Sequence, residues 1–121
     1  MDSRKIGALG EVAAVRFLRA KGYDIVTGNF QTRLGEIDII AQNKDYLCFV
    51  EVKTRGEGML YTPREAVGYA KRQKIIATAK QYLMLYPTKK QPRFDVVEVY
   101  TKNGTVDKIK LIPNAFDAEG R

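Results

Sequence analysis

Apolar residues follow first a helical and then a strand-like pattern along the chain. Between residues 3 and 21 they recur every three or four positions, which predicts an amphipathic helix. Its apolar side carries Ile6, Leu9, Ala13 and Phe17. Gly22 follows as a helix-terminating residue. Residues 23–30 are then predicted to form a short strand, and the basic segment 31–34 a turn.

Two runs rich in isoleucine and valine come next, at residues 36–41 and 46–54. The polar link 42–45 separates them, so the pattern predicts a β-hairpin. Residues 55–61 are punctuated by glycine, and we expect them to form a mobile loop.

A second helix is predicted to follow a start signal at residues 62–65. Thr62-Pro63-Arg64-Glu65 resembles a capping box with proline at the first helical position. The helix should run to about Tyr86, with a weak point at Gly68, and Pro87 should end it. Its apolar stripe consists of Ile75, Ile76, Ala79, Tyr82, Leu83 and Tyr86.

The last part of the chain is predicted to be a second hairpin. Residues 93–101 and 106–112 read as strands, and Asn103-Gly104 is a favoured hairpin turn. The tail 113–121 is expected to be frayed. The predicted order is therefore α-β-β-β-α-β-β, which favours a single α/β domain over residues 1–121 with helices flanking a mixed β-sheet.

Composition narrows the classes of chemistry. The 121 residues carry 21 Lys and Arg against 14 Asp and Glu, a net charge of +7, which favours a polyanionic partner such as DNA. The chain has no histidine and one cysteine, so histidine-based nucleophilic catalysis and zinc sites are excluded. A metal would be a hard cation such as Mg²⁺ or Mn²⁺, bound by oxygen. The lone cysteine and the absence of a signal peptide or membrane-spanning run predict a cytoplasmic protein without membrane association.

Charged residues interrupt the first predicted hairpin. Glu36 and Asp38 lie in its first strand, and Glu51 and Lys53 lie in its second. Because side chains alternate along a strand, Asp38, Glu51 and Lys53 converge if both strands present these faces to the same side. Two carboxylates and an ammonium there would make a metal site. The alternative is a structural salt bridge on a solvated face of the sheet.

Other polar residues have similar alternatives. Glu11 lies on a partly apolar flank of the first helix, where it either points toward the hairpin or faces solvent. Gln73 either reaches the site or faces water. Lys71, Arg72 and Lys74 form a basic cluster that is either a solvated helix face or a phosphate contact.

The sequence resembles the bacterial YraN family. The resemblance rests on Gly10-Glu11 and on the segments GEIDIIA at 35–41, FVEVKTR at 49–55 and RFDVV at 93–97, and it covers residues 7–99. That family is assigned to the restriction-endonuclease-like superfamily, the PD-(D/E)XK nucleases, so the resemblance implies that superfamily's fold. One departure is visible, because Ile37 and not proline precedes Asp38.

The resemblance implies a role for each site residue. Asp38 and Glu51 match the metal-ligating acids, and Lys53 matches the catalytic lysine. Glu11 matches an acid that relatives supply from the first helix, acting directly or through water, and the backbone carbonyl of Val52 would complete the metal shell. Gln73 takes the place of a glutamine that some relatives carry on the following helix.

The expected activity is metal-dependent hydrolysis of phosphodiesters in DNA. Flanking phosphates would contact a set of basic and polar residues, namely Arg33, Arg55, Arg64, Lys71, Arg72 and Gln73. The DNA is either plain duplex or a branched or single-stranded form, RNA stays an alternative substrate, and a homodimer is one way to cut both strands. The rival interpretation is a nucleic-acid-binding protein that keeps the nuclease fold without turnover.

Overall fold

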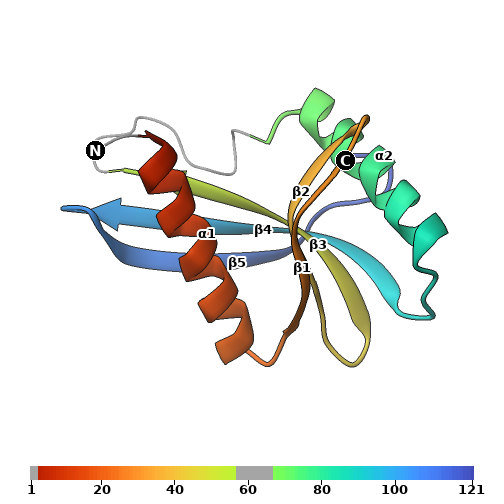
Figure 1. The fold of residues 1–121 in the computed structure, drawn as a ribbon, viewed down its shortest axis with the longest axis horizontal. Helices are drawn as coiled ribbons and strands as arrows, with labels where there is room; N and C mark the ends of the chain where they lie inside the picture. Colours follow the sequence, from red (N-terminus) through yellow and green to blue (C-terminus); the bar gives the residue numbers. More distant parts are fainter. Residues whose placement is uncertain (1–2, 57–66) are drawn as a thin grey trace.

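The computed structural model describes residues 3–56 and 67–121, which form two helices and five strands (Figure 1). The elements are α1 (Ser3–Ala20), β1 (Asp24–Thr32), β2 (Gly35–Gln42), β3 (Tyr46–Arg55), α2 (Tyr69–Leu85), β4 (Gln91–Lys102) and β5 (Thr105–Phe116). This order is the predicted one. No helix in the described ranges is long and apolar enough to cross a membrane.

The five strands form one sheet in the order β1-β2-β3-β4-β5. Strands β3 and β4 are parallel, and the other neighbours are antiparallel. A parallel pair needs a crossover connection, and α2 lies in it. The predicted mixed sheet flanked by helices is therefore confirmed, with β3 at its centre.

Each helix buries its apolar side against a different face of the sheet. On one face, Ala14 and Leu18 of α1 pack with Ile39, Cys48 and Val97 of the sheet. On the other face, α2 packs against the sheet through a second cluster. Its members include Ile37, Ile40, Phe49, Ile75, Ile76, Tyr82 and Phe94. Alternating side chains of the central strands supply both clusters, as expected for a sheet that is covered on both sides.

Helix α1 lies unusually close to β3 because of Gly10. This glycine is buried, and a methyl group in its place would overlap the hydroxyl of Thr54 in β3. The close approach fixes the height of α1 above the sheet. It also fixes the position of Glu11, the next residue.

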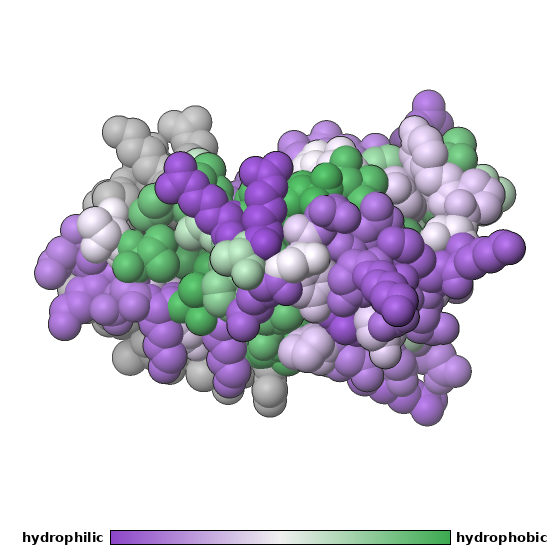
Figure 2. Space-filling view, turned by 90° about the horizontal axis from the view of Figure 1, so that it is seen from below, coloured by the Kyte–Doolittle hydropathy of each residue, from purple (hydrophilic) through white to green (hydrophobic). Residues whose placement is uncertain are grey.

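Apolar surface remains exposed beside α1, where Val12 keeps 51% of its surface accessible. A nearly apolar groove of about 450 Å³ lies between α1 and β5, lined by Leu9, Val12, Phe17 and Ile109 among others. Figure 2 shows apolar surface between projecting hydrophilic side chains on the side seen from below. A second groove, on the β1–β2 side of α1, carries charged residues and is described with the site.

The C-terminal tail is ordered, so the expectation of a frayed segment after Pro113 is wrong. Strand β5 continues to Phe116, whose ring stacks on Phe94 with centroids 5.1 Å apart. The pairing shifts register opposite Asp95, and the Asn114 N–H donates to the Asp95 carboxylate (2.9 Å). The bulge leaves room for Pro113, which has no N–H to pair. After it, the Asp117 carboxylate accepts hydrogen bonds that close a terminal turn.

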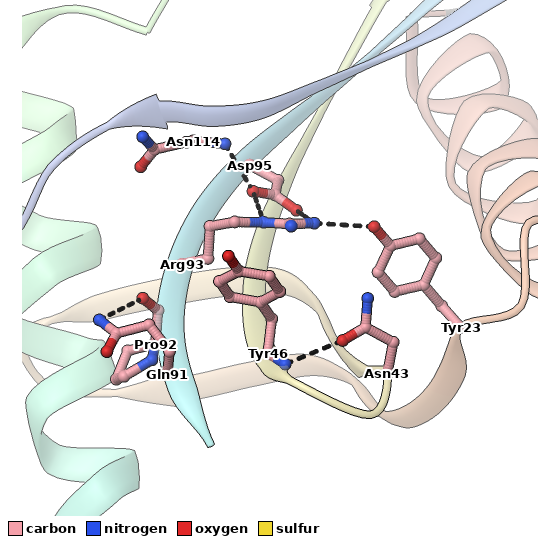
Figure 3. A network of polar contacts seen from close by, with 8 residues as sticks. All are labelled: Tyr23, Asn43, Tyr46, Gln91, Pro92, Arg93, Asp95 and Asn114. Carbon is pink, nitrogen blue, oxygen red and sulfur yellow. Dashed lines mark hydrogen bonds and ion pairs between the residues drawn. The ribbon is translucent and has the colours of Figure 1, made fainter.

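Asp95 also holds a half-buried arginine at the same end of the sheet (Figure 3). Arg93 donates to both carboxylate oxygens of Asp95 at 2.9 Å and to the Tyr23 hydroxyl at 2.8 Å. Its guanidinium lies 4.5 Å from the centre of the Tyr46 ring. Burial alone would lower the pKa of Arg93, but these hydrogen bonds raise it, so the charge persists. The RFDVV segment thus joins the start of β1 to β3, β4 and β5.

The second helix begins later than its start signal suggests. It starts at Tyr69 after Gly68, whose extended backbone (φ −72°, ψ 169°) is not helical, in line with the predicted weak point. The predicted capping box and most of the predicted mobile loop, at residues 57–66, lie outside the described residues, and so does Arg64.

We expect Gly10→Ala to destabilise the protein, because the added methyl group forces α1 away from Thr54 of β3. The expected loss is about 1–3 kcal/mol of unfolding free energy, typical of overpacking. Chemical denaturation measures it. Gly7→Ala is the matched control, since nothing lies within 4 Å of the added methyl group and alanine favours a helix. Equal stability of the two variants would contradict the close packing of α1.

Candidate metal and nucleic-acid site

Strands β2 and β3 separate at Asp38. Their pairing ends at Ile39 and Val50, and beyond this point the Val52 N–H donates to Asp38 Oδ2 (2.8 Å) instead of to a backbone carbonyl of β2. Asn29 lies on β1 between the residues that pair with Ile39 and Ile37 of β2, and it has a left-handed backbone with φ 51°. A side-chain carboxylate therefore takes over a backbone hydrogen bond where the two strands diverge, and we call this gap the fork.

The position of Asp38 differs from the sequence prediction. Strict alternation would give Ile37 and Ile39 the same face and Asp38 the opposite one, but Ile37 and Ile39 pack in opposite cores, so the alternation breaks at the residue between them. Asp38 consequently lines a groove on the α1 side, together with Glu11. The left-handed backbone of Asn29 on the neighbouring strand accompanies this break, which a strict period of two does not foresee.

Glu51 lies on β3 and is almost completely buried, with 1% of its surface accessible. Its Oε2 atom is 2.8 Å from the Lys71 ammonium of α2 and 3.8 Å from the Lys53 ammonium. Its Oε1 atom is buried and has no hydrogen-bond partner among the described residues. A buried carboxylate oxygen without a donor costs free energy, so this atom is ready to accept a cation or a proton.

The buried charges shift each other's protonation. Burial, and then the nearby Asp38 carboxylate, raise the pKa of Glu51 from 4.5 to about 7, although Lys71 and Lys53 oppose the change. Burial, and then the neighbouring Lys71 ammonium, lower the pKa of Lys53 from 10.5 to about 8. Both groups can therefore gain or lose a proton near neutral pH, a property that clusters at functional sites.

Glu11 stands across the groove from Asp38. Burial, and then the Asp38 and Glu36 carboxylates, raise the pKa of Glu11. Glu11 is exposed to solvent and lines the same groove as Asp38, so the structure combines features of the two alternatives that the sequence left open.

The donor set at the fork fits a hard divalent cation. Asp38 Oδ1 makes no hydrogen bond with the described residues, and Glu51 Oε1 is a buried oxygen without a donor. In residues 7–56 and 67–121, no three acidic, histidine or cysteine side chains gather closely enough to hold a metal by themselves. A direct shell of Glu11, Asp38 and Glu51 together is thus not assembled. Two carboxylates, with water and a backbone carbonyl such as that of Val52, suit Mg²⁺.

The predicted phosphate contacts on α2 are engaged within the protein. Lys71, 44% exposed, pairs with Glu51. The Arg72 guanidinium donates to the Val67 carbonyl (3.2 Å), and the Gln73 amide donates to the Glu119 carbonyl (2.8 Å) in the terminal turn. Gln73 therefore does not reach the fork in this structure.

Two other predicted phosphate contacts lie outside α2. Arg33 is exposed in the turn between β1 and β2, and Arg55 is half-buried at the end of β3, where it donates to the Thr54 carbonyl (3.1 Å). The sequence prediction missed the contact of Lys71 with Glu51. Its only sequence signal was membership of a basic cluster, because the rotation of α2 relative to the sheet cannot be read from spacing.

Comparisons with known proteins show the family of the chain. The model of "Uncharacterised protein family UPF0102", the family of the YraN proteins, matches residues 10–99. A UPF0102 protein of Acetivibrio thermocellus is 48% identical over 121 residues, covering 95% of this chain and 93% of the relative. One of Alkaliphilus oremlandii is 47% identical, covering 94% and 99%. One of Caldanaerobacter subterraneus is 42% identical, covering 96% and 98%.

Glu51→Gln should remove a pH dependence of stability. Because the pKa of Glu51 is raised in the folded state, the folded state binds its proton more tightly than the unfolded state. Stability should therefore fall as the pH rises from 4.5 to about 7. Glutamine has the same shape without the charge, so the variant should be more stable at pH 7.5 by about 1–3 kcal/mol.

Urea denaturation of both proteins between pH 4 and pH 8, with chelator present, measures this difference. Glu36→Gln, which removes an exposed carboxylate from β2, is the control and should follow the parent protein. A Glu51→Gln variant that is less stable than the parent at pH 7.5 would show that the carboxylate is fully compensated.

Proposed function

The chain belongs to the UPF0102 family, and we propose that it is a metal-dependent endonuclease that hydrolyses phosphodiester bonds in DNA. The observation that carries the proposal is the Glu51 carboxylate, which is buried at the fork with one oxygen unpartnered. A protein gains little stability from such a group. Binding of a cation would compensate the charge of this buried carboxylate.

Asp38 and Glu51 would hold Mg²⁺ or Mn²⁺, with the Val52 carbonyl and water in the remaining positions and Glu11 acting through water. When bound, such a cation lowers the pKa of a coordinated water and polarises a phosphate oxygen. Asp38 is already oriented for this role, because the Val52 N–H fixes its other oxygen.

Lys53 would act on the water and the phosphate. It lies beside Glu51, and its pKa of about 8 places its proton within reach of exchange near neutral pH. As an ammonium it would orient the attacking water and stabilise charge that builds on the phosphate. Arg33, Arg55 and Arg64 would contact flanking phosphates and position the strand without reading its sequence.

The geometry favours this proposal over its alternatives. A salt bridge on a solvated face does not fit Glu51, which is buried in the centre of the sheet. A binding protein without turnover would gain nothing from Asp38 and Glu51, because carboxylates beside a phosphate repel it unless a cation lies between them.

The direct test is cleavage of labelled DNA in the presence of Mn²⁺, Mg²⁺ or chelator. The probes are linear duplex, single strand, flap and four-way junction, each also prepared as RNA where possible. We expect metal-dependent cutting that Asp38→Asn abolishes and that the control Asp107→Asn, an exposed acid of β5, retains. Cleavage that persists in the presence of chelator, or in the Asp38→Asn variant, would contradict the proposal.

Lys53→Ala should separate cleavage from binding. We expect it to lower the rate of cutting by at least about 100-fold, the usual contribution of a positioned proton-transfer or charge-stabilising group. DNA affinity should stay within a few-fold of the parent, as measured by fluorescence anisotropy. Lys110→Ala removes an exposed lysine of β5 and should change neither quantity. Parallel losses of cutting and affinity in Lys53→Ala would argue against a catalytic role.

Lys71→Ala should increase the affinity for Mn²⁺. The Lys71 ammonium pairs with the same carboxylate that would bind the cation, so its positive charge competes. At pH 8, where Glu51 is ionised, we expect roughly tenfold tighter binding, about 1.4 kcal/mol. Isothermal titration calorimetry measures it, with Lys80→Ala as the control on an exposed part of α2. Weaker Mn²⁺ binding by Lys71→Ala would mean that Lys71 supports the site instead.

A further inference from the structure

Two arginines of α1 stand out because no described residue pairs with them. Arg16 and Arg19 are exposed, and neither makes an ion pair or a hydrogen bond with the residues that the structure describes. On α2, by contrast, Lys71 and Arg72 have protein partners. Helix α1 therefore carries two guanidinium groups that have no partner among the described residues, and the sequence prediction did not assign them to DNA.

Both arginines line the groove that contains Asp38. This groove lies between α1 and the β1–β2 pair and has a volume of about 300 Å³. Its walls are Glu11, Val12, Val15, Arg16, Arg19, Gly28, Asn29, Asp38 and Ile39. It therefore joins Glu11 and Asp38 to two arginines that have no partner among the described residues, with mainly apolar surface between them.

The spacing of these groups suits a phosphodiester strand. At 1.5 Å per residue, Arg16 lies about 7.5 Å and Arg19 about 12 Å along the helix from Glu11. A strand of B-form DNA advances about 3.4 Å per phosphate along the helix axis, so Arg16 lies about two and Arg19 about three to four phosphate steps from Glu11. A phosphate at the acidic end needs a cation beside it, whereas phosphates at the other end meet arginine directly.

We propose that this groove binds the DNA strand next to the phosphodiester that is cut, with Arg16 and Arg19 contacting consecutive phosphates. The exposed side chain of Val12 and its neighbour Val15 pack against the sugars and bases. The proposal rests on the proposed function for the location of the cut. Its contacts are independent of turnover, because they involve neither the cation nor Lys53.

The test is the salt dependence of DNA binding, measured by fluorescence anisotropy in the Asp38→Asn background, which prevents cutting and removes one repelling charge. We compare Arg16→Ala/Arg19→Ala with Lys80→Ala/Lys89→Ala, which removes the same charge from exposed positions on and after α2. With single-stranded DNA, each lost phosphate contact reduces the slope of log affinity against log salt by about 0.7. We expect a reduction of about 1.4 and roughly tenfold weaker binding at 50 mM salt for the arginine pair, and little change for the lysine pair.

The conservative pair Arg16→Lys/Arg19→Lys should restore most of the slope, because it keeps both charges. Thermal unfolding of each variant checks that the fold is intact, as expected for exposed side chains. An unchanged slope for the arginine pair, an equal reduction for the lysine pair, or no DNA binding by the parent protein would overturn the groove.

The outcomes also distinguish this inference from the proposed function. Metal-dependent cutting by the wild-type protein together with an unchanged slope leaves the nuclease proposal in place and removes the groove. A reduced slope together with no cutting of any probe supports the groove in a protein that binds DNA without hydrolysing it.

Discussion

The site is built around the charge of Glu51 in the interior of the sheet. Removing a carboxylate from water is costly, and its stabilisation depends on what surrounds it. Here the surroundings include two ammonium groups, of Lys71 and Lys53, and another carboxylate, that of Asp38. Helix α2 supplies Lys71, and strand β2 supplies Asp38 at the point where it diverges from β3. The charge of Glu51 is therefore balanced only when both elements hold these positions.

Two local departures from regular structure bring the remaining parts to that charge. The break in alternation at Asp38 turns its carboxylate toward α1, and Gly10 lets α1 come close enough for Glu11 to face it. Neither feature contributes to the hydrophobic cores. Both instead determine which polar groups lie near one another between the two hydrophobic cores.

Periodicity and turn chemistry predicted the fold because they report local preferences and burial. They identified the order of elements, the hairpin turns and the neighbouring positions of Glu51 and Lys53 on one strand, whereas the face that Asp38 occupies differs from the prediction. They did not predict the ordered tail, since Asp95 stabilises the bulge at Asn114 through a contact distant in sequence. They also missed the partner of Lys71, which depends on how α2 is rotated against the sheet.

Helix α2 spans the gap between the two diverging strands. Lys71 reaches Glu51 on β3, while Lys74 and Thr78 lie against Gly35 at the start of β2. These three residues occupy about 10 Å of one rigid helix, so α2 acts as a spacer that sets the width of the opening. A displacement of the helix along its own axis would change that width and withdraw the ammonium at the same time. The position of α2 along its axis therefore determines both the width of the opening and the pairing of Lys71 with Glu51.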